Sequence, residues 1–210
     1  MTDHSSELDN LLHRASLGEA GAVDDLFSRY RDQLKQMVQL RLDRRLQGRV
    51  DPSDVLQDAF VDAVRNLQDY LAAPRVSLLL WLRYLVGMRL KALHRHHLGV
   101  KHRDAKLEVS IYQGPLPAAD SAALAERLLG NFTSPSEAVI RTERMLRLQE
   151  ALNGMDPLDR EILTLRHFEN LSRAESAQEL GIEEGAAGKR YLRALQRLRK
   201  LLDDQNLSGG

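Results

Sequence analysis

The chain has 210 residues, and its 30 Lys and Arg balance 30 Asp and Glu, so the formal net charge at pH 7 is zero. This length suffices for one or two domains with apolar cores, and 29% charged residues argue against an integral membrane protein. No apolar stretch approaches the roughly 18 residues that span a bilayer, and the opening residues MTDHSSELDN lack the pattern of a signal peptide. The absence of cysteine excludes a disulfide framework and a thiolate nucleophile, and we expect a cytoplasmic protein.

Hydrophobic residues recur with a period of 3.6 wherever the chain has a pattern, and no alternating β-branched run competes with it. The sequence therefore predicts an all-α fold, with helices over residues 7–15, 20–46, 52–71, 78–97, 135–152, 157–168, 173–180 and 183–203. Capping chemistry marks several helix starts. Asp51, Ser134 and Asp156 each precede a proline, and Ser172 with Glu175 predicts a capping box.

The helical pattern fails between residues 108 and 133, a segment with Gly114, Pro115 and Pro117 and only a brief helical patch at 122–129. A connection of this length is unusual inside one compact domain, so it either tethers two domains or performs a task itself. We expect two small helical domains, over residues 1–107 and 134–210, joined by a flexible linker over 108–133.

Carboxylates line one side of the helix predicted from Pro52, while Val55, Leu56 and Ala59 begin its buried stripe. Such a row repels phosphate and is expected to meet a basic protein surface. A solvated face whose early acids complement the helix dipole is the alternative, and it accounts for the first carboxylate better than for the later ones. The row consists of Asp51, Asp54, Asp58 and Asp62, with Gln57 beside it.

Cations gather between Trp81 and Lys106, where seven Lys and Arg and four His face the single acid Asp104. On the helix over 78–97 we expect a half-buried body and a basic exposed face with Arg83, Lys91, His94, Arg95 and His97, which favours a polyanionic partner. Trp81 and Tyr84 are candidates to stack on unpaired bases, and a core anchor is the equal alternative for Trp81. A metal shared by His94, His96, His97 and His102 is disfavoured because no carboxylate completes the site, so no metal or cofactor is expected.

The segment LSRAESAQELGIEEGAAGKRYLRALQRLRK (171–200) has the spacing of a helix-turn-helix. Ala177 is small where two helices approach, and Gly181 permits a left-handed turn. Six cations and no acid fall between Lys189 and Lys200, as expected for a helix in a major groove. An αα-hairpin with a solvated basic face is the alternative.

Together these segments resemble extracytoplasmic-function (ECF) sigma factors, which keep only regions 2 and 4 of the sigma-70 family. DPSDVLQDAFVDAV (51–64) resembles region 2.2, and WLRYLVGMRLKALHRHH (81–97) resembles regions 2.3 and 2.4. The segment that opens with LDREILTLRHF (158–168) resembles region 4. HRHHLGVKHRDAKLEVSIY (94–112) is similar to a subgroup common in planctomycetes.

The resemblance implies a transcription initiation factor, not an enzyme, that binds core RNA polymerase and directs it to promoter DNA. It implies contacts with the β′ clamp helices through Asp51, Asp54, Gln57 and Asp58, and a further contact with the β flap. The residues implied at the −10 element are Trp81, Arg83, Tyr84, Arg89, Lys91, His94, Arg95, His97 and Lys101. Those implied at the −35 element are Ser172, Arg173, Ala186, Lys189, Arg190, Arg193 and Arg197.

Two departures from the family pattern bear on these roles. Met88 stands where the family usually has an asparagine that helps to hold a flipped base, and Gly188 costs about 1 kcal/mol relative to alanine inside a helix. An anti-sigma factor or a kinase is a further candidate partner. The alternative function is an autonomous helix-turn-helix regulator of transcription, which has no use for the acidic row.

Overall fold

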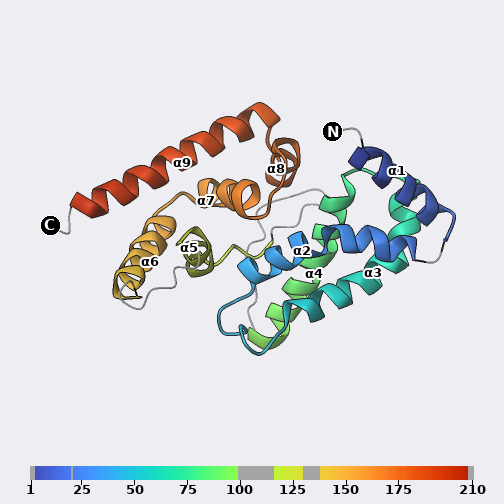
Figure 1. The fold of residues 1–210 in the computed structure, drawn as a ribbon, viewed down its shortest axis with the longest axis horizontal. Coiled ribbons are helices and arrows are strands. Elements are labelled where there is room, and N and C mark those ends of the chain that lie inside the picture. Colours follow the sequence, from blue (N-terminus) through green and yellow to red (C-terminus); the bar gives the residue numbers. More distant parts are fainter. Residues whose placement is uncertain (1–2, 20, 99–115, 130–137, 208–210) are drawn as a thin grey trace. The chain divides into compact units, whose positions relative to one another are not determined.

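A computed structural model describes residues 3–19, 21–98, 116–129 and 138–207 (Figure 1). Within these ranges every regular element is a helix, apart from one isolated bridge between Gln47 and Val50. The chain divides into an N-terminal unit, Met1–Val38 with Arg45–Pro117, and a C-terminal unit, Gln39–Arg44 with Ala118–Gly210. The predicted all-α, two-domain fold class is confirmed.

The N-terminal unit holds α1 (Asp3–Ser16), most of α2 (Ala22–Arg41), α3 (Pro52–Ala72) and α4 (Leu78–Leu98). α3 starts as predicted, because the Asp51 carboxylate accepts a 2.7 Å hydrogen bond from the Ser53 amide and Pro52 fills the first helical position. The prediction for α2 is wrong at its end. The helix stops at Arg41 instead of Leu46, and Leu42 and Leu46 are buried outside helical geometry.

Two aromatic pairs join the helices of this unit. Phe27 of α2 meets Phe60 of α3 edge to face, with ring centroids 5.3 Å apart. Tyr70 of α3 stacks on Trp81 of α4 at 4.6 Å, and its hydroxyl donates a 3.0 Å hydrogen bond to the Val76 carbonyl. Aromatic pairs of this kind stabilise the fold beyond the contribution of the apolar area that they bury, and they hold α3 between α2 and α4.

The C-terminal unit contains α5 (Ser121–Leu129), α6 (Ala138–Asn153), α7 (Pro157–Leu163), a π-helical turn η2 (Thr164–Phe168), α8 (Arg173–Leu180) and α9 (Glu184–Leu207). α5 confirms the helical patch predicted at 122–129, and its Leu124 and Ala125 belong to the buried core of this unit. The predicted start of α6 around Ser134 and Pro135 lies outside the described residues.

The helix-turn-helix is confirmed. Ser172 and Glu175 form the capping box that starts α8. Gly181 ends that helix in the left-handed region, with φ of 64°, and the Ile182 amide then bonds to the Ala177 carbonyl. Ala177 and Ala187 are both buried where the two helices meet.

Among the described residues, no helix has both the length and the apolar character that crossing a membrane requires.

Candidate functional site

Asp51, Asp54, Gln57 and Asp58 lie at the start of α3 and are exposed. Residues three and four apart share one helix face, so Asp54, Gln57 and Asp58 form one polar surface. We name these three residues, together with Asp51, the acidic stripe. The backbone hydrogen bond from Ser53 lowers the pKa of Asp51. Asp51 therefore carries its negative charge at neutral pH.

Asp62, the last member of the predicted row, has a partner inside the unit. Its two carboxylate oxygens pair with Nε and Nη2 of Arg89 on α4. The hydrogen bond that Arg89 donates to Asp62 raises the pKa of Arg89, against the lowering effect of burial. Arg89, which was predicted to contact DNA, is thus turned toward α3 in this structure.

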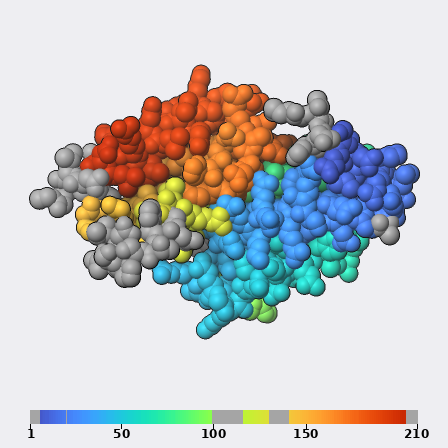
Figure 2. All heavy atoms as spheres, in the orientation of Figure 1, coloured from blue at the N-terminus to red at the C-terminus, as the bar shows by residue number. Residues whose placement is uncertain are grey.

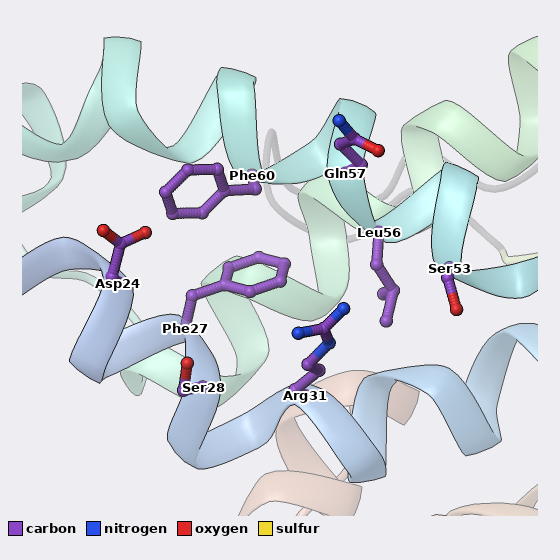
Figure 3. A pocket seen from close by; sticks show the side chains of 8 residues that line it. All are labelled: Asp24, Phe27, Ser28, Arg31, Ser53, Leu56, Gln57 and Phe60. Atoms are coloured by element: carbon purple, nitrogen blue, oxygen red, sulfur yellow. The ribbon is translucent and has the colours of Figure 1, made fainter.

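A groove opens beside the acidic stripe, between α2 and α3 (Figure 3). It has a volume of about 210 Å³, and Phe27 and Phe60 form part of its lining. Ser53 and Gln57 contribute to it from α3, so the groove and the acidic stripe share Gln57. Sequence reasoning missed its α2 side, although the spacing of three and four residues is a helix-face signal: the residues are Asp24, Phe27, Ser28 and Arg31.

The first half of α4 is buried on more than one side. Trp81 is 4% exposed and stacks on Tyr70, so the core-anchor alternative describes its position here. Arg83 is 2% exposed, which corrects the expectation that it lies on a basic outer face. The residues from Leu78 to Leu82 are all buried, so this part of the helix is in contact with the core on every side. The sequence pattern predicted only one buried stripe.

The second half of α4 opens to solvent. Tyr84, Lys91 and His94 are half-buried, whereas Arg95 and His97 are exposed in the last turn. Cations in a last turn also complement the helix dipole, so their presence alone does not identify a nucleic-acid site. Lys101 and His102 lie outside the described residues. In the part of the chain that is described, no three His, Asp or Glu side chains meet as metal ligands would.

The predicted DNA-contact residues of α8 take part in local structure. The Ser172 hydroxyl accepts a 3.1 Å hydrogen bond from the Glu175 amide and so caps the helix. Arg173 is exposed and pairs with Glu184 at 2.7 Å across the turn. Both residues lie at the start of α8.

The predicted contact residues of α9 divide into two groups. Ala186 and the cations Lys189 and Arg193 are exposed, as expected for an outward face. Arg190 and Arg197 instead pair with Asp159, a buried carboxylate of α7. The expectation that all these cations face outward is therefore corrected. Sequence reasoning missed Asp159, because nothing in the first turn of α7 distinguishes a buried acid from one that serves the helix dipole.

Comparison with known proteins places these features in a family. The family model described as Sigma-70, region 4, matches residues 145–198. The ECF RNA polymerase sigma factor SigM of Mycobacterium tuberculosis (strain ATCC 35801 / TMC 107 / Erdman) is 30% identical over 200 residues, which cover 95% of this chain and 86% of SigM. BldN, an ECF RNA polymerase sigma factor of Streptomyces coelicolor, is 25% identical over 95% of this chain and 67% of its own length.

A solved structure supports the fold. CnrH, in complex with the cytosolic domain of CnrY, aligns with a TM-score of 0.53 and 23% sequence identity, over 92% of this chain and 96% of that chain. The identity to SigM along nearly the whole length, together with the region 4 match over the helix-turn-helix, settles the family. The chain belongs to the ECF RNA polymerase sigma factors.

Proposed function

We propose that this ECF sigma factor binds core RNA polymerase through the acidic stripe of α3 and promoter DNA through α4 and α9. The separation of charge carries the proposal: exposed acids on α3 lie in one unit, and exposed cations on α9 lie in the other. Among the described residues Asp54 forms no ion pair, so its charge is available to a basic protein partner.

The polymerase surface is assigned to the β′ clamp helices, on the resemblance of residues 51–64 to region 2.2. The acidic face of α3 is complementary in charge to a basic helical surface. Such complementarity raises the association rate and makes binding selective for that partner. The groove beside the stripe offers a recess next to these charges, so an apolar side chain flanked by polar ones suits it. The β flap is the partner proposed for the C-terminal unit.

The −35 element is assigned to α9, whose basic face fits phosphates beside a major groove. The −10 element is assigned to the outer half of α4 and to Tyr84, which is less buried than Trp81 on the same helix. Phosphate contacts place the protein on the duplex and carry little sequence information, so promoter choice rests on few side chains. Polymerase supplies the catalysis.

Finer assignments complete the proposal. They are region 2 over residues 1–107, a linker over 108–133 whose α5 packs into the C-terminal unit, and region 4 over 134–210. A cytoplasmic location and membership of the planctomycete-like subgroup are proposed as well. Control by an anti-sigma factor or a kinase stays a prediction.

Charge reversal tests the polymerase assignment. Asp54→Lys with Asp58→Lys is expected to abolish capture of core polymerase by the tagged chain and run-off transcription from genomic fragments, while the circular dichroism spectrum is retained. Asp9→Lys with Glu150→Lys changes the net charge equally at exposed positions elsewhere and is the matched control. Equal polymerase capture by the two folded double variants would contradict the proposal.

A further inference from the structure

Asp159 is a carboxylate with 2% exposure in the first turn of α7, and it receives two arginines from α9. Nη1 of Arg190 donates to its Oδ1 at 2.8 Å, and Nη1 of Arg197 donates to its Oδ2. Each oxygen thus has its own guanidinium. Asp156, which caps α7, adds a longer contact of 3.5 Å to Arg190.

The spacing of the two arginines makes this a two-point attachment. They stand seven residues apart, which is about two helical turns, so both lie on the same side of α9. A rotation of α9 about its axis, or a shift along it, would break both charge-assisted bonds at once. Arg190 and Arg197 are 34% and 57% exposed as side chains, yet their guanidinium groups turn inward to α7.

The attachment determines which side of α9 is presented outward. At 100° per residue, Lys189, Arg193 and Lys200 fall within about 40° of one another. All three are exposed, and they continue the line of Ala186. Ala187, Ala194 and Leu198 are buried on the side facing the core of the unit. The red atoms of α9 lie at the surface in Figure 2.

We propose that Asp159 is a positioning residue for promoter recognition: it holds α9 at one rotation, and Arg190 and Arg197 act through it and do not contact phosphate. The phosphate contacts then belong to Lys189, Arg193 and Lys200. This inference rests on the proposed binding of α9 to the −35 element.

Salt dependence of promoter binding separates the two groups of cations. The probe is a labelled promoter duplex obtained from the run-off selection, titrated with holoenzyme reconstituted from the full chain at several KCl concentrations. Each phosphate contact contributes about 0.9 to the slope of log K against log [KCl]. Arg193→Gln is expected to lower the slope by about that amount, and Arg197→Gln is expected to leave the slope unchanged. A reduction of the slope by Arg197→Gln equal to that by Arg193→Gln would overturn the proposal.

Selectivity tests the positioning role itself. Asp159→Asn keeps the shape of the side chain and removes the charge that holds both arginines. We expect a loss of about tenfold in the ratio of affinities for the promoter duplex and a duplex with a scrambled −35 element, comparable to one mismatched base pair. The salt slope is expected to stay unchanged. A residue that only stabilised the fold would alter neither quantity in folded protein, so an unchanged ratio in folded Asp159→Asn overturns the proposal.

Two further measurements keep the test decisive. If Asp159→Asn does not fold, Arg197→Gln, which changes an exposed side chain, is expected to show the same loss of selectivity, and an unchanged ratio there overturns the proposal. Unfolding of the free chain by urea, with Asp159→Asn and Arg197→Gln alone and combined, measures their coupling without DNA. Lack of promoter binding by wild-type holoenzyme would refute the proposed function, whereas a coupling of zero would refute the role of Asp159 alone.

Discussion

The guanidinium of Arg41 donates a 2.7 Å hydrogen bond from Nε to Oε1 of Glu169, and both side chains are shut off from solvent within the C-terminal unit. Nη2 of the same arginine reaches Glu161 at 2.5 Å. Burial alone would lower the pKa of Arg41, but the attraction of the two carboxylates outweighs it and the pKa is raised. Residues of the sequence's first quarter thus complete the electrostatics of a unit built mainly from its second half.

Arg41→Ala is expected to destabilise the chain by about 3 to 5 kcal/mol, because it leaves Glu169 buried without its cation. Urea unfolding followed by circular dichroism measures the loss. Arg14→Ala, which breaks the exposed pair with Glu19, is the control and is expected to cost much less, because solvent screens an exposed pair. Equal losses of unfolding free energy in the two variants would show that the buried ion pair contributes no more to stability than the exposed one.

Local chemistry explains which parts of the fold were predictable. Helix starts at Asp51 and Ser172 follow from side chains that satisfy nearby backbone amides, so a few adjacent residues determine them. The turn at Gly181 is equally local. These features were read correctly because no distant partner takes part in them.

Long-range partners explain what was missed. Asp159 joins arginines 31 and 38 residues away, and Arg41 joins glutamates 120 and 128 residues away. No periodicity connects such positions. The widening of α7 into η2 is local by contrast: the Thr164 hydroxyl donates a hydrogen bond to the Arg160 carbonyl, and the Glu169 amide donates one to the Thr164 carbonyl.

The cap at Ser172 allows its structural role to be separated from its predicted DNA contact. Ser172→Ala removes the acceptor for the Glu175 amide and is expected to cost about 1 kcal/mol in the free energy of unfolding. Ser172→Asp keeps a capping oxygen, so stability is expected to be retained, while the added negative charge weakens promoter binding. Urea unfolding and filter binding of holoenzyme measure the two effects. Retained promoter affinity in Ser172→Asp would place this residue away from DNA.

Tyr70 predicts a loss of stability in alkali. Burial, with Tyr30 adding to it, raises the pKa of Tyr70 to about 12, whereas an unfolded tyrosine has a pKa of about 10. Between these values the unfolded state releases the proton first, so the stabilisation is complete below about pH 10 and is lost as the pH rises toward 12. Lysines and other tyrosines titrate there too, so Tyr70→Phe is the necessary reference.

The measured quantity is the difference in unfolding free energy between wild type and Tyr70→Phe from pH 8 to pH 11. Below pH 10 the wild type is expected to be more stable by about 1 kcal/mol, because its hydroxyl bonds to the Val76 carbonyl. From pH 10 to pH 11 that advantage is expected to fall by on the order of 1 kcal/mol. A difference that is constant up to pH 11 would contradict the burial of the phenol.

Gly188 gives the sharpest test of the helix-turn-helix surface. It lies within α9, where glycine costs about 1 kcal/mol relative to alanine, and a Cβ there would stand 3.1 Å from Cδ of Arg173. Arg173 is exposed and held by Glu184, so its flexible side chain is able to move by a few tenths of an ångström. Gly188→Ala is therefore expected to raise the free energy of unfolding by up to about 1 kcal/mol.

Gly185→Ala, also in α9 but with open space around it, is the matched control. If Arg173 contacts the −35 element, only Gly188→Ala is expected to weaken promoter binding; a stabilised Gly188→Ala with unchanged affinity would remove Arg173 from the DNA interface.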